Sequence, residues 1–328
     1  MTKWTPFVLA LGLVLALYLA WSEGPATASP SPLPGRLVTI EAFASKSVAP
    51  RKVIVWLPPS YDQDVANGSA AYDVLYMHDA RNLFEPATAM GGETWGVAEA
   101  ANALMAQGKI RKTIIVGMDN TKARSREYMP NGVYQALSPD DQATLAKAMG
   151  GPPLSDGYLK FIVEELKPFI DRTYKTQPGR DHTFIMGSSM GGLISLYALA
   201  EYPNVFGGAG CLSTHWPLPA FDLLMRTPQI EQEHSVSAFK QYLGPRLKTL
   251  KNHKLWLDHG TETLDRLYGP YQEQIDAFLS SMPADKAPVW TSRVYPGAAH
   301  NEASWRAHID DPLVFLLGTE PGNSKRSK

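Results

Sequence analysis

Short apolar runs alternate with amphipathic patterns along most of the chain. The runs typical of strands cover residues 37–44, 52–57, 72–77, 113–118, 182–186, 208–212, 255–258 and 289–295. Helical patterns cover residues 94–107, 158–174, 190–200 and 270–279, and a last helix is expected from about residue 303. This alternation predicts an α/β fold with a doubly wound, mostly parallel sheet and helices on both faces.

Three segments modify this simple alternation. The first two strand-like runs are short and apolar or alternating, which favours a half-exposed antiparallel edge, whereas the more continuous runs at residues 72–77 and 113–118 suit strands covered on both faces. Pro168 lies inside a predicted helix and indicates a kink there or a helix in two pieces. Residues 213–252 contain no strand-like run, and we expect an inserted cap over one end of the sheet.

The N-terminal segment has the pattern of a secretory signal. The apolar run from Phe7 to Trp21 is shorter than the roughly 20 residues of a membrane span. Ala26 and Ala28 fit the small-residue pattern of a cleavage site, so we expect a signal peptide over residues 1–28. The alternative is an uncleaved membrane anchor. Either way, the folded part is expected outside the cytoplasm, in the periplasm or secreted.

The remaining boundaries follow from composition. The proline-rich residues 29–36 are typical of a linker, residues 37–318 form the predicted domain, and the polar residues 319–328 are expected to be a disordered tail. The chain has 31 Lys and Arg against 32 Asp and Glu, which gives no basic surface for nucleic acid. Cys211 is the only cysteine, so no internal disulfide can form. Nothing in the sequence specifies an oligomeric state.

A candidate nucleophile lies between a predicted strand and a predicted helix. Gly187, Ser189 and Gly191 form a Gly-x-Ser-x-Gly motif at this junction. A nucleophilic serine on such a sharp turn requires small residues two positions away on each side. Ser189 is therefore the predicted nucleophile, and the neighbouring Ser188 has the wrong spacing. The alternative is a glycine-rich turn with an ordinary serine.

The candidate base lies after the last predicted strand. In this architecture the nucleophile, the acid and the histidine follow one another along the chain, and only His300 and His308 lie late enough. His300 follows the strand through a short loop, which would deliver it to the same sheet edge as Ser189. His308 lies in a predicted helix and is expected to be solvated or to cap that helix.

Three carboxylates compete for the acid: Asp258, Glu262 and Asp265. We choose Asp265 over Glu262 because its shorter side chain loses less rotamer entropy when it is fixed. Leu264 and Leu267 flank it and could hold its backbone in place. Each of the three carboxylates could instead cap a helix or carry a solvated charge.

The remaining candidates surround the nucleophile. The backbone N–H groups of Met190 and Ala80 are the predicted oxyanion hole, while His78 and Asp79 read as a structural hydrogen-bonded pair. Aromatic residues could line a substrate pocket suited to an aryl ester, or could be core of the cap; they are Trp95, His215, Trp216 and Phe221. This chemistry needs no metal and no cofactor.

Several motifs together resemble the putative esterase family of the α/β-hydrolase fold, over roughly residues 37–317. They are residues 75–79 (LYMHD), 116–120 (VGMDN), 126–130 (REYMP), 187–192 (GSSMGG) and 300–305 (HNExxW). The family includes enterochelin, feruloyl and acetyl-xylan esterases, S-formylglutathione hydrolase and mycolyltransferases. Its members often have Gly and Gln where this chain has Ala80 and Arg81, and their usual acid position holds Thr263 here.

The resemblance implies a serine carboxylesterase that forms an acyl-enzyme with a small-molecule ester. Export argues against S-formylglutathione hydrolase activity, because its thiol substrate is cytosolic. An acyltransferase that uses an alcohol or sugar in place of water is the enzymatic alternative. A non-catalytic binding module that keeps the fold is the third possibility. A membrane partner is expected only if the N-terminal segment stays uncleaved.

Overall fold

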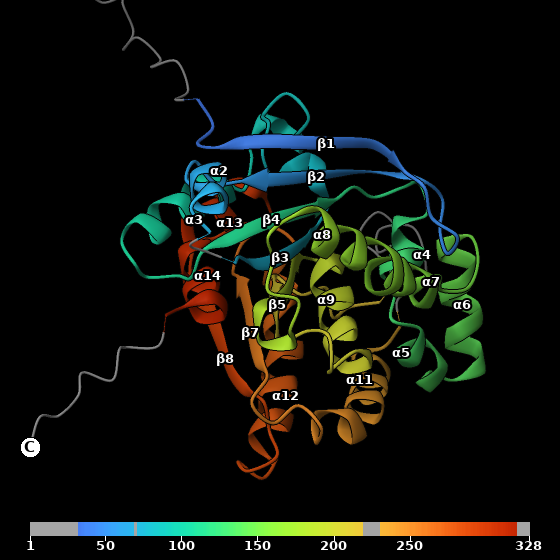
Figure 1. Ribbon diagram of the computed structural model, residues 1–328. Coiled ribbons are helices and arrows are strands. Elements are labelled where there is room, and N and C mark those ends of the chain that lie inside the picture. The colour runs from blue at the N-terminus through green and yellow to red at the C-terminus, as the bar shows by residue number, and fades with distance from the viewer. Residues whose placement is uncertain (1–31, 69–70, 219–229, 320–328) are drawn as a thin grey trace, which may run out of the picture. The chain divides into compact units, whose positions relative to one another are not determined.

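The computed structural model describes residues 32–68, 71–218 and 230–319, and within them eight strands form one mixed sheet (Figure 1). The order across the sheet is β1-β2-β4-β3-β5-β6-β7-β8. The strands are β1 (Arg36–Phe43), β2 (Arg51–Leu57), β3 (Asp73–His78), β4 (Thr113–Met118), β5 (Thr183–Ser188), β6 (Gly208–Leu212), β7 (Lys254–Gly260) and β8 (Val289–Tyr295).

The pairing confirms a mostly parallel sheet with an antiparallel edge. β1 pairs with β2 and β2 with β4 in antiparallel fashion, whereas all pairs from β4 to β8 are parallel. Strands β3 to β6 are buried along their whole length, which explains their continuous apolar sequences. Because these strands are parallel, their carboxyl ends meet at one edge of the sheet.

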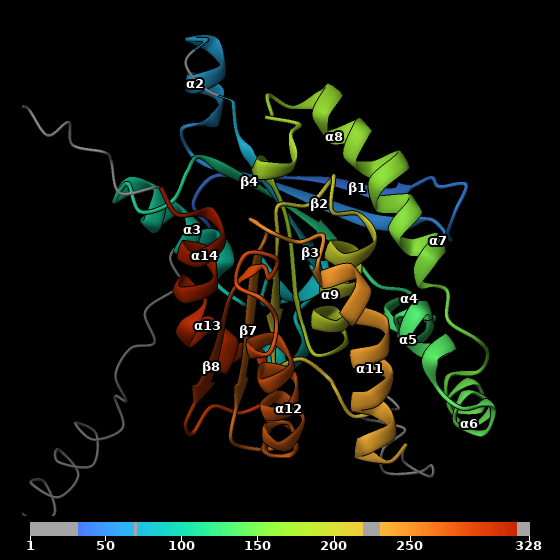
Figure 2. The same cartoon turned by 90° about the horizontal axis from the view of Figure 1, so that it is seen from below.

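Helices cover both faces of the sheet. Figure 2 shows α3 and α14 on one side of the strands and α8, α9 and α11 on the other. The helices are α2 (Tyr61–Ala66), α3 (Val97–Ala106), α4 (Arg124–Tyr128), α5 (Asn131–Ala136), α6 (Pro139–Met149), α7 (Ser155–Lys160), α8 (Lys167–Thr173), α9 (Met190–Glu201), α11 (Gln232–Leu247), α12 (Gly269–Ser280), α13 (Glu302–His308) and α14 (Asp310–Leu317).

The helix that contains Pro168 is not broken. α7, a π-helical segment (Phe161–Leu166) and α8 follow one another directly. The N–H of Lys167 bonds to the carbonyl of Ile162, a five-residue step that widens the helix just before the proline. Pro168 is the second residue of α8 and lies directly after this widened turn.

Several predicted segments lie wholly or mostly outside the described residues. They are the signal peptide, residues 29–31 of the predicted linker and the tail beyond Thr319. The predicted linker ends one residue too late, because Arg36 already begins β1. The described parts of the predicted cap include α11, which packs against α5, α9 and α12. In the described ranges, no helix has both the length and the apolar character that a bilayer crossing requires.

Candidate active site

Ser189 occupies a strained turn between β5 and α9. Its φ of 58° and ψ of −125° are rare for a residue with a side chain. Its N–H donates to the carbonyl of Leu212 at 2.9 Å, which ties the turn to the end of β6. A Cβ on Gly187 would lie 2.9 Å from the His78 ring and 3.0 Å from Gly191, so the motif requires glycine there.

The loops after β7 and β8 bring an acid and a histidine together. Asp265 begins a 3-10 turn (Asp265–Leu267), and its Oδ1 lies 2.5 Å from Nδ1 of His300. The backbone N–H of His300 donates to Oγ1 of Thr263 at 2.8 Å. Thr263 therefore holds the backbone of His300 from the position where the family usually has its acid, while Asp265 contacts the ring.

The second oxygen of Asp265 accepts two short hydrogen bonds. Ser213 Oγ and the Gly260 N–H each lie 2.6 Å from Oδ2. Burial works to raise the pKa of Asp265, but the hydrogen bonds and the charge of His300 outweigh it and hold the pKa below its usual range. Asp265 is therefore an ionised acceptor beside His300.

The other two candidate acids point elsewhere. Asp258 is fully buried and accepts from Trp256 Nε1 at 2.6 Å and from the Ser213 N–H at 2.9 Å. Burial raises its pKa to about 7. Glu262 is exposed, and its Oε1 lies 3.5 Å from the hydroxyl of Thr261. Of the three carboxylates, the structure brings Asp265 to His300.

Tyr268 packs against the histidine, and sequence reasoning did not find it. Its ring packs edge-on against His300, with 5.7 Å between ring centroids, and its hydroxyl lies 2.7 Å from Nδ1 of His215. Burial raises the pKa of Tyr268 well above 10, while a hydrogen bond with Ser189 acts in the opposite direction. His215 also donates its backbone N–H to the carbonyl of Ser189 at 3.2 Å.

The two predicted oxyanion donors begin helical turns at the same sheet edge. Met190 is the first residue of α9, so its N–H has no partner within the helix. Ala80 begins a 3-10 turn directly after Asp79, whose φ is 57°. A Cβ on Gly191 would lie 3.6 Å from His78 Cβ, which shows that the turn after β3 packs against the start of α9.

His78 and Asp79 bind other partners rather than each other. His78 Nδ1 lies 2.8 Å from the hydroxyl of Tyr158, and burial lowers its pKa to about 3. Asp79 accepts two bonds from Arg124, at 2.9 and 2.7 Å, and one from Asn120 at 2.6 Å. The expectation of a hydrogen-bonded pair is therefore replaced by two separate structural contacts.

The predicted aromatic residues occupy different surroundings. Trp95 packs on Trp305 with 5.3 Å between ring centroids, and Trp305 in turn packs on His300 at 5.1 Å. Trp216 is fully buried, and its Nε1 donates to Gln272 at 2.8 Å. Phe221 lies outside the described residues. Trp95 is therefore separated from His300 by Trp305 alone, and His215 contacts the backbone of Ser189. Trp216, in contrast, packs in the core.

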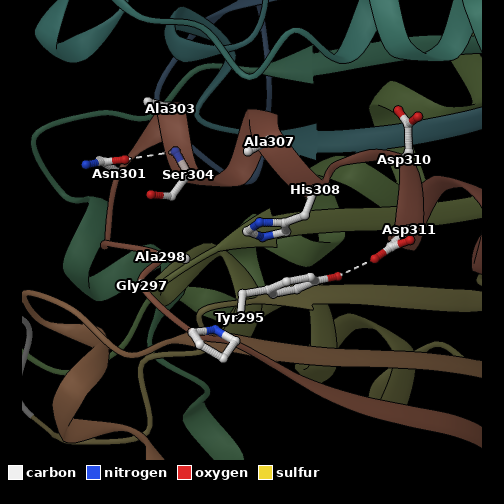
Figure 3. A pocket seen from close by; sticks show the side chains of 11 residues that line it. Tyr295, Gly297, Ala298, Asn301, Ala303, Ser304, Ala307, His308, Asp310 and Asp311 are labelled. Atoms are coloured by element: carbon white, nitrogen blue, oxygen red, sulfur yellow. Dashed lines mark hydrogen bonds between the residues drawn. The ribbon is translucent and has the colours of Figure 1, made fainter.

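His308 lines a separate open cleft of about 710 Å³ (Figure 3). Its ring stacks on Tyr295 at 3.8 Å, and the Tyr295 hydroxyl donates to Asp311 at 2.7 Å. Burial lowers the pKa of His308 to about 4. His308 therefore differs from the expected solvated or capping residue. Within the described ranges, no group of three or more His, Cys, Asp or Glu has a metal-site arrangement.

The mixed sheet and the strand–turn–helix serine at its carboxyl edge define an α/β-hydrolase. A family model described as "Putative esterase" matches residues 46–316. The chain belongs to this esterase family.

Named relatives and solved structures agree with this assignment. The chain is 30% identical over 183 residues to the ferri-bacillibactin esterase BesA of Bacillus subtilis, covering 54% of this chain and 57% of that protein. A ferulic acid esterase structure has a TM-score of 0.58 at 20% identity, covering 87% of this chain and 98% of the other. The structure of the enterobactin esterase FES of Shigella flexneri has a TM-score of 0.59 at 17% identity, covering 88% of this chain and 60% of the other.

The match to the curated relatives is partial. The chain spans 57–60% of their length. At 17–20% identity, the two solved structures support the fold alone.

Proposed function

We propose that this protein is a carboxylic ester hydrolase in which Ser189 is the nucleophile, His300 the base and Asp265 the acid. The observation that carries the proposal is the 2.5 Å contact between Asp265 Oδ1 and His300 Nδ1. This contact leaves Nε2 of His300 as the nitrogen that serves the nucleophile. Tyr268 packs on His300 and contacts His215, whose backbone N–H donates to the carbonyl of Ser189.

The mechanism follows from these positions. Ser189 Oγ attacks the ester carbonyl while His300 Nε2 takes its proton, and Asp265 stabilises the imidazolium that forms. The N–H groups of Met190 and Ala80 would bind the oxyanion. When the tetrahedral intermediate collapses, the alcohol leaves with the proton from His300. Water then attacks the acyl-enzyme by the same route and releases the carboxylic acid and free Ser189.

We propose an aromatic ester as the substrate class. The relatives named above carry the names of esterases for ferulic acid, enterobactin and ferri-bacillibactin. In this chain, Trp305 packs edge-on against His300 and Trp95 packs on Trp305, so aromatic side chains lie on the candidate base's side of the site, and this supports the proposal.

We also propose that the protein is exported and cleaved after Ala28. The apolar run that ends near Trp21 and the small residues Ala26 and Ala28 support this assignment. N-terminal sequencing of protein from the periplasm or medium should begin at Ser29. Recovery only from membranes with Met1 intact would favour the anchor.

The test of the activity is a matched pair of serine variants. Ser189→Ala should fold normally and lose at least about a thousandfold in turnover of p-nitrophenyl and feruloyl esters, and it should no longer react with a fluorophosphonate probe. Ser188→Ala removes a hydroxyl one residue away and should keep most activity. Full activity of Ser189→Ala would contradict the mechanism, whereas acyl transfer to an added alcohol in place of hydrolysis would identify an acyltransferase.

A further inference from the structure

Trp305 and Ser213 form a hydrogen-bonded chain behind Asp265. Trp305 lies in α13, Ser213 follows β6, and both are buried. Trp305 Nε1 donates to Ser213 Oγ at 2.9 Å, and Ser213 Oγ lies 2.6 Å from Asp265 Oδ2. Because an indole N–H can only donate, Ser213 Oγ accepts this bond and directs its own proton to Asp265.

The chain closes into a ring through His300. The Trp305 indole packs edge-on against the His300 imidazole, with an interplanar angle of 81°. His300 in turn contacts the other oxygen of Asp265. Trp305 therefore touches the base directly and reaches the acid through Ser213, so that one side chain constrains both members of the pair.

The backbone of Ser213 is itself held in an unusual conformation. Its φ is 42°, a left-handed value that is strained for a residue with a side chain. Its N–H donates to the buried carboxyl of Asp258 at 2.9 Å, and Trp256 Nε1 binds the other oxygen of Asp258 at 2.6 Å. Backbone strain held in place by a buried partner is typical of functional sites.

We infer that Ser213 and Trp305 are positioning residues that fix the Asp265 carboxylate and the His300 ring for the reaction. This inference rests on the proposed function. Both residues are uncharged at the point of contact, so they fix the carboxylate without cancelling its charge. Asp265 then keeps its full charge for the imidazolium that forms when Ser189 is deprotonated.

Two variants remove the chain at different links. Trp305→Phe keeps an aromatic ring against His300 but removes the N–H, and Ser213→Gly removes the hydroxyl while glycine tolerates the positive φ. Each should lower kcat by about tenfold to a hundredfold, since a small misplacement of catalytic groups has effects of this size. KM should stay within about twofold.

The double variant tests whether the two residues act as one unit. Because Trp305 reaches Asp265 through Ser213, the double variant should be no more than about twofold slower than Ser213→Gly. The far-downfield proton NMR signal of the His300 Nδ1–H should shift or broaden in all three variants. A kcat within twofold of the native value for both single variants would overturn the inference. A double variant whose loss in kcat equals the product of the two single losses would overturn it as well.

A matched control separates positioning from stability. Trp56 in β2 is also a buried tryptophan, and its Nε1 donates to the carbonyl of Pro34 at 2.7 Å. Trp56→Phe should lose stability but keep kcat and the His300 signal. If Trp305→Phe does not fold, Ser213→Gly alone decides the question. Activity in Ser189→Ala would refute the proposed function itself, whereas an inactive Ser189→Ala with fully active Ser213 and Trp305 variants would refute only this inference.

Discussion

Two carboxylates flank Ser189 across the sheet, and their surroundings differ. Asp79 follows β3 and faces the guanidinium of Arg124 with two bonds, at 2.9 and 2.7 Å. Asp265 follows β7 and is held by the neutral donors Ser213 and Gly260 in addition to His300. A guanidinium cancels the charge that it binds, whereas neutral donors fix a carboxylate and leave its charge in place.

The comparison assigns different roles to similar residues. Burial works to raise the pKa of Asp79, but Arg124 and Asn120 hold this pKa below its ordinary value. Burial works to lower the pKa of Arg124, but the charge of Asp79 outweighs it, so the pKa of Arg124 is raised. This pair is complete and needs no further partner. Asp265 instead has an incomplete charge balance, which a protonated His300 would complete. We therefore expect Asp79 to act on stability and Asp265 on turnover.

The largest effect should come from Asp265→Asn. An amide at this position would disturb the tautomer of His300 and could not stabilise the imidazolium, so turnover of a p-nitrophenyl ester should fall about a hundredfold or more. Glu262→Gln is the control in the same loop and should cost little. The reverse pattern would move the assignment to Glu262, and small effects from both would indicate Asp258 or a Ser–His dyad.

Asp79→Asn should act on stability instead. Asparagine tolerates the left-handed backbone of this position, but it leaves the partly buried Arg124 without a counter-charge. We expect a loss of about 2 kcal/mol in the free energy of unfolding, measured with urea. Adding Arg124→Gln should recover part of this loss. A variant as stable as the native protein would show that the ion pair contributes nothing.

The sequence predicted the sheet well because its central strands are apolar on both faces. The run at residues 72–77, for example, became β3 over Asp73–His78. Short helices between Met118 and Ser155 were not predicted, since five- or six-residue helices carry little periodicity. α6 did carry signals, because Ser138 caps it, Pro139 begins it and Gly150 ends it.

The candidate site was predictable mainly where its residues lie in motifs. Ser189 and His300 follow predicted strands at short, recognisable spacing. Asp265 lies in no motif and was chosen by side-chain length and flanking leucines, of which Leu264 is buried as expected but Leu267 is exposed. Ser213, Tyr268 and the hydrogen bond of Trp305 could not be found in this way. Trp305 and Ser213 are 92 residues apart, and no local pattern encodes a contact across that separation.

A third carboxylate extends the comparison to pH. Burial raises the pKa of Asp258 to about 7, so the folded protein keeps a proton that the unfolded chain loses near pH 4. The resulting stabilisation is full below about pH 4 and is lost as the pH rises through about 7. The free energy of unfolding of the native protein, relative to Asp258→Asn, should therefore fall by up to about 1.4 kcal/mol per pH unit in this window.

The difference in the free energy of unfolding between the native protein and Asp258→Asn isolates the contribution of Asp258. Burial lowers the pKa of His78 to about 3 and that of His308 to about 4, so both stabilise the fold as the pH rises, in the opposite sense to Asp258. Both histidines are present in native protein and variant, and their contributions cancel in the difference. Parallel profiles from pH 4 to 8 would contradict a raised pKa for Asp258.

The smallest effect should come from Arg81→Gln, which replaces an unusual residue beside Ala80 by the one common in the family. Arg81 contacts Asp119 at 2.9 and 3.1 Å, but its side chain is 48% exposed, in contrast to the more enclosed Arg124. Exposed ion pairs contribute about 0–1 kcal/mol and are screened by salt. Urea unfolding should therefore show a loss below about 1 kcal/mol that disappears at high salt. Because Arg81 points to Asp119 and Arg124 holds Asp79, turnover should stay within about twofold; a tenfold loss would show that the exposed pair, too, shapes the turn at Ala80.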